Sequence, residues 1–300
     1  MFQRVLVGVD GRRGGRDAIT LARQLTAPDG VITLAHIYGS DVARAGNSSL
    51  ATLEGRAQAE ALLEQERESA ALAAQVIVAC EHRVGRGLHL LAERLRADLL
   101  VIGSTSHGLT GRVLMGDGTR AGLSGAPCAI AIASHGYRHS VHELATLGVG
   151  YDGSPESEVA LAAARELAAQ QGSTVWALQV VPPGDDDDDS PIPLGQPEDT
   201  SWVIRHTIER PRQFDDDVEG DAICGQPREE LVRFGENLDL LVVGSRGYGP
   251  LGRLFQGGVS EYLSRHAPCP LLILPRASLE VGAAGLPGRA EEPAMIGGRR

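Results

Sequence analysis

The stretch LDLLVVGSRGYGPLGRLFQGGVS, residues 238–260, decides the fold. Its apolar run at residues 240–243 has the length and the β-branched content of a strand buried on both faces, and the run ends at Gly244. A loop rich in glycine follows directly. Glycine lets a loop backbone adopt positive φ and approach a ligand closely, so the N–H groups of such a loop can bind an anion. The stretch therefore predicts a buried strand followed by a phosphate-binding loop.

A second copy of this stretch lies earlier in the chain, where residues 99–119 read LLVIGSTSHGLTGRVLMGDGT. Three pairs of glycines share one offset of 141 positions, namely Gly103 and Gly244, Gly111 and Gly252, and Gly116 and Gly257. A single glycine is explained by a tight turn, but a repeated pattern in register is not. The Ala-Pro-Cys triplet that follows each loop, and a strand ending in Asp-Gly near the start of each copy, extend the repeat.

The repeat divides the chain into two copies of one domain. Two domains of about 140 residues are each large enough for an independent core. We expect a first domain at residues 1–134, a linker at 135–143, a second domain at 144–275 and a disordered tail at 276–300. The five consecutive aspartates at 185–189 predict a solvated loop, because adjacent carboxylates repel one another and form no coordinating geometry without a folded scaffold.

Apolar runs alternate with amphipathic segments in both copies. In the first copy we expect strands at residues 4–9, 31–38, 75–79, 99–102 and 128–133, with helices at 14–26, 47–74, 88–96 and near 120. In the second we expect strands from 144 and at 174–181, 218–223, 240–243 and 270–274, with helices at 154–171 and 227–236 and a weaker candidate at 200–213. This alternation predicts an α/β fold of two tandem open, parallel five-stranded sheets flanked by helices, Rossmann-like in layout.

Composition excludes several classes of protein. A formal charge of −11 argues against general electrostatic binding to nucleic acid or an anionic membrane, since both need a positive surface. The chain has no lysine, which excludes a Walker A lysine and a Schiff-base lysine. No apolar run approaches the roughly 20 residues of a membrane span, and no signal segment precedes the first strand, so we expect a cytoplasmic protein.

The four cysteines, Cys80, Cys128, Cys224 and Cys269, form no CxxC pair and have no histidine at zinc spacing. They are interpreted as reduced and mostly buried thiols.

Two features of each copy converge on one edge of the predicted sheet. Asp10 and Asp152 end the first strands, and the glycine loops end the fourth strands. Ligands of open parallel sheets bind outside the carboxyl ends of the strands, so these features build a pocket in each copy. A carboxylate facing a phosphate-binding loop suits a nucleoside phosphate, although Asp-Gly can also simply cap a turn. The GxGxxG at residues 247–252 follows the fourth strand instead of the first, so it is not a dinucleotide fingerprint.

Each half resembles a universal stress protein domain, a fold similar to that of the adenine nucleotide alpha hydrolases. Nucleotide-binding members of this family carry glycine, two residues, glycine, nine residues, and then glycine and Ser or Thr. Gly244, Gly247 and Gly257 match this pattern in the second half, where Gly258 replaces the hydroxyl residue. The resemblance covers residues 1–134 and 144–275.

The first half departs further from the family pattern. Gly103 and Gly116 match, but Ser106 replaces the middle glycine and Asp117 replaces the hydroxyl residue. A carboxylate at ~4 Å from a phosphate charge costs roughly 1 to 4 kcal/mol, unless Mg²⁺ bridges the two. Gly258 keeps a backbone donor and lacks only the hydroxyl. We therefore predict that ATP, alone or with Mg²⁺, binds the second site better than the first.

The resemblance implies an ATP-binding regulatory or stress-response protein without robust enzymatic activity, in which the two copies pair through their last strands. It implies that Asp10 and Asp152, with backbone near Ile37 and Val180, contact the adenine and ribose. It implies phosphate contacts from Gly103, Ser106, Gly116 and Gly118 in the first half, and from Gly244, Arg246, Gly247, Gly257, Gly258 and Val259 in the second.

Two other classes of function remain open. The motif losses favour an interaction scaffold that keeps the fold and binds no nucleotide. The absence of lysine and of a Ser-His-Asp or paired-acid motif argues against a related nucleotide-binding enzyme, while weak ATP hydrolysis is not excluded. The expected partner is an adenine nucleotide, with no nucleic acid and no membrane, and both a homodimer and an unidentified regulatory protein are compatible with the sequence.

Overall fold

The computed structural model describes residues 1–39, 49–105, 111–116, 119, 125–139, 143–182, 217–245 and 258–275. The predicted tail at 276–300, the aspartate run at 185–189, the helix candidate at 200–213 and most of the helix expected near residue 120 lie outside these ranges. Within them, no helix is both long enough and apolar enough to cross a membrane.

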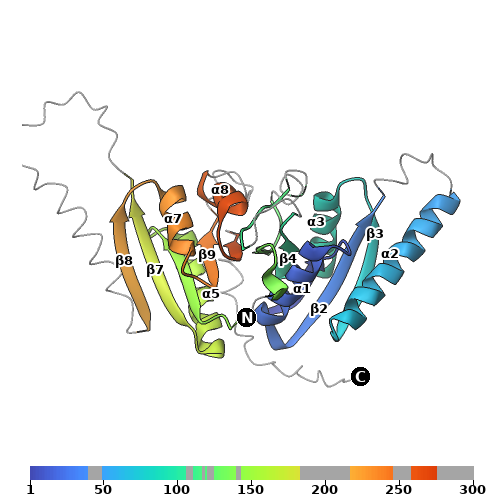
Figure 1. Ribbon diagram of the computed structural model, residues 1–300, viewed down its shortest axis with the longest axis horizontal. Helices are drawn as coiled ribbons and strands as arrows, with labels where there is room; N and C mark the ends of the chain where they lie inside the picture. Colours follow the sequence, from blue (N-terminus) through green and yellow to red (C-terminus); the bar gives the residue numbers. More distant parts are fainter. Residues whose placement is uncertain are drawn as a thin grey trace, which may run out of the picture.

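The described strands form a single ten-stranded sheet with the order β3-β2-β1-β4-β5-β10-β9-β6-β7-β8. The strands of the first half are β1 (Phe2–Gly8), β2 (Thr26–Tyr38), β3 (Ala74–Cys80), β4 (Leu99–Gly103) and β5 (Ala129–Ala133). Those of the second are β6 (Thr146–Tyr151), β7 (Thr174–Val181), β8 (Val218–Cys224), β9 (Leu240–Gly244) and β10 (Leu271–Leu274). Figure 1 shows the halves side by side, with β3 and β8 at the outer edges.

All strands within a half pair in parallel, and the halves meet where β5 pairs antiparallel with β10. At this junction Leu271 lies opposite Ile132 and Ile273 opposite Ile130. The predicted α/β class is confirmed, and so is the pairing of the copies through their last strands. The expectation of two separate sheets is corrected to one continuous sheet, because this pairing satisfies N–H and C=O groups that would otherwise line two open edges.

Helices cover both faces of the sheet. They are α1 (Arg13–Leu25), α2 (Ser49–Ser69), α3 (Val84–Leu95), the 3-10 turn η1 (Tyr137–His139), α5 (Pro155–Gln171), α7 (Pro227–Gly235) and α8 (Gly258–His266). Side chains of α1, α2 and α5 belong to the apolar cluster on one face, and those of α3, α7 and α8 belong to the cluster on the other. Each cluster contains residues of both halves, so the two cores are continuous across the junction.

The sequence pattern explains most element boundaries. Ser154 caps α5 by accepting a hydrogen bond from Ser157 N at 3.2 Å, Pro155 opens the helix, and Gly172 closes it in the left-handed region at φ 74°. The start of β2 differs from expectation. The strand begins at Thr26 and not at residue 31, because Thr26 already pairs with Phe2 of β1, and the register shifts between Phe2 and Arg4.

The connector between the halves is anchored to the first half. The side chain of Asp17 on α1 is fully buried and accepts hydrogen bonds from Gly136 N at 2.8 Å and Arg138 N at 3.0 Å. Tyr137, between them, is only 3% exposed. The predicted polar linker at 135–143 therefore begins as a packed turn, since a buried carboxylate is stable when backbone N–H groups satisfy it.

The four cysteines are free thiols, two buried and two exposed. Burial raises the pKa of Cys128 and of Cys269 to about 12, so these thiols stay protonated and unreactive at neutral pH. The prediction that most of the cysteines are buried is wrong for Cys80 and Cys224, which end the two outermost strands.

The junction strand β10 carries a large share of the core. Leu272 has no exposed surface and packs in the apolar cluster that spans both halves. We expect Leu272→Ala to lower the free energy of unfolding by about 2 to 5 kcal/mol, measured by chemical denaturation, because it leaves a cavity at the junction. The control Val31→Ala, at a side chain that is 46% exposed, is expected to change stability by less than about 0.5 kcal/mol. Equal effects of the two substitutions would contradict this assignment of the core.

Candidate functional site

Each half has a cavity at the carboxyl ends of its strands. The first cavity, about 360 Å³, is lined by residues of the ends of β1, β2 and β4, and the second, about 520 Å³, by the corresponding ends of β6, β7 and β9. Both volumes fall in the usual range of small-molecule sites, about 300 to 1,000 Å³. The convergence expected from the sequence thus takes the form of one cavity per half.

The described residues of the predicted site all line these cavities. Those of the first half are Asp10, Ile37, Gly103 and Gly116, and those of the second are Asp152, Val180, Gly244, Gly258 and Val259. The other predicted site residues, Ser106, Gly118, Arg246, Gly247 and Gly257, lie outside the described residues.

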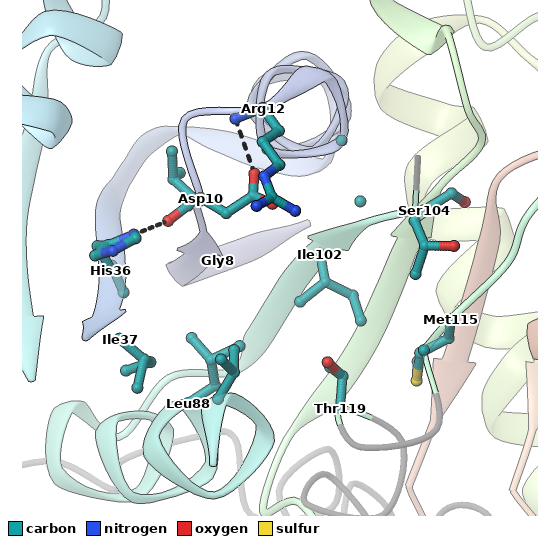
Figure 2. A pocket seen from close by; sticks show the side chains of 18 residues that line it. Gly8, Asp10, Arg12, His36, Ile37, Leu88, Ile102, Ser104, Met115 and Thr119 are labelled. Carbon is teal, nitrogen blue, oxygen red and sulfur yellow. Dashed lines mark hydrogen bonds between the residues drawn. The ribbon is translucent and has the colours of Figure 1, made fainter. Parts of the chain in front are cut away.

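A backbone turn orients the aspartate of each cavity. Arg12 N donates to Asp10 Oδ1 at 3.0 Å, and Ser154 N donates to Asp152 Oδ1 at 2.9 Å (Figure 2 draws the first of these bonds). The sequence allows Asp10 and Asp152 either to cap a turn or to contact a ligand. Both are compatible, because the turn occupies one carboxylate oxygen and orients the other.

Apolar side chains form one wall of each cavity. Figure 2 shows Ile37, Leu88 and Ile102 on one side of the first cavity and Asp10 and Arg12 on the other. Val180, Leu231 and Val243 line the second cavity in the same way. The sequence analysis missed the contribution of α3 and α7, which supply Leu88 and Leu231, although the apolar spacing of both helices was visible. An apolar wall facing a carboxylate suits a planar ring that carries hydrogen-bond donors.

The glycines that end β4 and β9 are required by packing. A Cβ on Gly103 would lie 1.8 Å from Gly14 O, and a Cβ on Gly244 would lie 2.5 Å from Glu156 O. The first turn of α1 or α5 therefore passes directly against the end of the fourth strand of its half. Packing is thus a reason for these two glycines that the sequence analysis did not consider, and their approach to a ligand stays a prediction.

The polar linings of the two cavities differ. The first contains Arg12 and His36 beside its aspartate. His36 Nδ1 lies 2.7 Å from Val9 O, so this nitrogen carries a proton and donates to the carbonyl. The second cavity is lined by Gln179 and by Glu156, a largely buried residue. All four residues were missed by the sequence analysis, because they are not glycines or strand-ending aspartates and only the fold brings them to the cavity.

Part of the loop after β4 is held in place by Ser104. Its hydroxyl donates to Ala133 O at 2.8 Å and accepts from Leu114 N at 3.0 Å, while Thr105 N donates to Leu114 O at 2.8 Å. These bonds return the chain to the cavity, where Met115 and Gly116 form part of the lining.

The described residues contain no group of three or more His, Cys, Asp or Glu side chains that could hold a metal ion. A divalent cation at either cavity would therefore need ligand oxygens in addition to those of the described side chains.

The comparisons with known proteins agree on one family. A model of the universal stress protein family matches residues 1–134 and 144–275. A universal stress protein of Mycolicibacterium smegmatis is 29% identical over 287 residues, which cover 90% of this chain and 96% of that protein. The Thermus aquaticus "Universal stress protein in QAH/OAS sulfhydrylase 3'region" is 30% identical over 142 residues, 43% of this chain and 97% of the relative.

A solved structure supports the same fold. The crystal structure of a universal stress protein from Archaeoglobus fulgidus matches with a TM-score of 0.66 and 18% identity, covering 90% of this chain and 97% of that chain.

Two glycines of the second cavity allow a matched test of the packing argument. We expect Gly244→Ala to lower the free energy of unfolding by about 1 to 3 kcal/mol, because its Cβ would overlap the backbone of α5. A Cβ on Gly258 would meet no described atom within 4 Å, so Gly258→Ala is expected to change stability by less than about 0.5 kcal/mol. Thermal and denaturant unfolding measure both, and a stable Gly244→Ala protein would contradict the packing role.

Proposed function

Because this chain belongs to the universal stress protein family, we propose that its two cavities bind an adenine nucleotide, with ATP as the expected ligand. The protein would then be a nucleotide-responsive regulator and not an enzyme. The observation that carries the proposal is the same arrangement in both halves: a turn-held aspartate, an apolar wall and the glycine that ends the fourth strand line one cavity.

The arrangement suggests an orientation for the nucleotide. The adenine would lie against the apolar wall, and the ribose hydroxyls or the base amino group would donate to Asp10 or Asp152. The phosphates of the second site would point toward Gly258, Val259 and Ser260, which open α8. The first N–H groups of a helix have no partner within the helix, and they favour an anion.

We propose that the second cavity is the better site. It is the larger of the two, and its loop keeps more of the family's glycine pattern. We further propose that residues 1–134 and 144–275 act as two domains of a cytoplasmic protein that transmits nucleotide occupancy to a regulatory partner, as a single chain or as a homodimer.

The scaffold function is the second candidate, and one observation favours it. Gly103 and Gly244 are needed for helix packing in any case, so their presence does not by itself require a ligand. Nucleotide binding by the full-length protein separates the two candidates.

We expect Asp10→Asn and Asp152→Asn each to weaken ATP binding at the cavity concerned by at least about tenfold, measured by titration calorimetry on the full chain. Asparagine keeps the Oδ1 atom that accepts from Arg12 N or Ser154 N, so the turn is preserved, while an NH₂ group that donates replaces the other carboxylate oxygen.

Glu219→Gln on β8 is the matched control, since it removes one negative charge from an exposed side chain that lines neither cavity. Its ATP binding is expected to equal that of the wild-type chain. No measurable ATP binding by the wild-type chain would support the scaffold function instead.

ATP binding at the second cavity should depend on Mg²⁺. Two acidic residues, Asp152 and Glu156, line this cavity. A divalent cation between carboxylate and phosphate oxygens reverses the sign of their interaction. We expect EDTA to weaken ATP binding at the second cavity at least several-fold, measured by titration calorimetry on the Asp10→Asn chain. Binding that EDTA leaves unchanged would contradict this charge assignment.

A further inference from the structure

A short segment of the first half is bonded to the second half, and we call residues 111–116 the strap. Val113 N donates to Ala267 O at 2.7 Å, and Met115 N donates to Ser264 O at 2.9 Å. Both acceptors belong to the C-terminal turn of α8 or to the residue just after the helix. The backbone of the strap therefore continues the hydrogen bonding of a helix that belongs to the other half.

The opposite edge of the strap is bonded to its own half. Leu114 N donates to Ser104 Oγ, and Leu114 O accepts from Thr105 N. Alternate residues thus bond in opposite directions, as in a strand between two neighbours. The side chains of Val113 and Met115 are 0% and 2% exposed, and they share one apolar cluster with Leu263 of α8. Backbone and side chains together fix the strap against α8.

The antiparallel junction explains why α8 reaches the first half. Strand β10 follows α8 closely, and β10 runs opposite to β5. The start of β10 therefore lies beside the end of β5, at the edge of the sheet where the first cavity opens. Figure 1 shows α8 near the middle of the molecule, on the side of the second half that faces α3 and β4.

Both ends of this connection line a cavity. Met115 and Gly116 of the strap line the first cavity, and Gly258, Val259 and Ser260 at the start of α8 line the second. The helix has nine residues and a length of about 13 Å, so it joins the two walls as a short rigid rod. One end of α8 therefore lies at the second cavity, and the other end is bonded to a segment that lines the first.

We propose that the strap and α8 form one mechanical unit that couples the occupancy of the two cavities, so that ATP bound in the second cavity tightens ATP binding in the first. This rests on the proposed nucleotide-binding function. Phosphates bound at the first turn of α8 hold the helix, and through it the backbone of Met115. The first cavity is then partly ordered before its own ligand arrives, which gives positive cooperativity.

The ligand-free chain tests the mechanical unit. Val113→Pro removes the N–H that donates to Ala267 O, and Val113→Ala keeps it. Amide hydrogen exchange at residues 262–266 of α8 is expected to accelerate at least tenfold in the proline variant relative to the alanine variant. Unchanged exchange in α8 would contradict the proposal that the strap and α8 form one mechanical unit. If the proline variant does not fold, Leu263→Ala replaces it, with faster exchange of the Met115 N–H as the expected result and unchanged exchange as the contradicting one.

ATP titration of the full chain tests the coupling. The first cavity is expected to bind ATP at least about fivefold more weakly in Asp152→Asn than in the wild-type chain with its second cavity filled. Because coupling of equilibrium binding is reciprocal, Asp10→Asn must weaken the second cavity by the same factor. In a chain that also carries Val113→Pro, Asp152→Asn should no longer weaken ATP binding at the first cavity, and Asp10→Asn should no longer weaken it at the second.

The outcomes separate the two proposals. Two cavities that both bind ATP, each unaffected by the substitution in the other, would overturn the coupling and leave the proposed function intact. ATP binding at neither cavity would overturn the proposed function and the coupling together. The hydrogen-exchange experiment would still show whether the strap and α8 stabilise each other.

Discussion

The antiparallel pairing of β5 with β10 is the constraint on which the rest of the structure depends. It joins two parallel five-stranded arrays into one sheet and makes the apolar clusters on both faces continuous across the halves. It also reverses the direction of the second half, so the end of α8 meets the edge where the first cavity opens. The same backbone pairing therefore joins the two cores and brings the end of α8 to residues 113 and 115 of the first half.

Close backbone approach is a second constraint, and it shapes both cavities. Helices α1 and α5 begin directly after the turn-held aspartates and pass against Gly103 and Gly244 with no room for a Cβ. This approach positions the aspartate, the helix start and the end of the fourth strand at one edge of the sheet. A glycine required for packing thus also shapes a cavity, and the two roles cannot be separated by its substitution alone.

Much of the candidate site was accessible from the repeated pattern. A strand that ends in Asp10 or Asp152 and a strand that ends in glycine must meet at one edge of a parallel sheet, and the cavities lie there. Glu156 and His36 were missed, because one is an ordinary residue of a helix start and the other lies inside a strand pattern. Whether these residues line a cavity depends on which side of the helix or strand faces it. The hydrophobic periodicity of the sequence does not show this at the end of an element.

The sequence by itself determined the duplicated α/β pattern, the elements and their order, because hydrophobic period, turn residues and helix caps are local properties that repeat in register. The family resemblance implied that the last strands pair. The tertiary structure alone decided that this pairing is antiparallel and makes one sheet, that Gly103 and Gly244 serve helix packing, and that the strap reaches α8. These features depend on contacts between residues more than 100 positions apart, such as Val113 with Ala267, and backbone N–H and C=O groups form them with little regard to side-chain type. A pattern of side chains therefore carries almost no record of them.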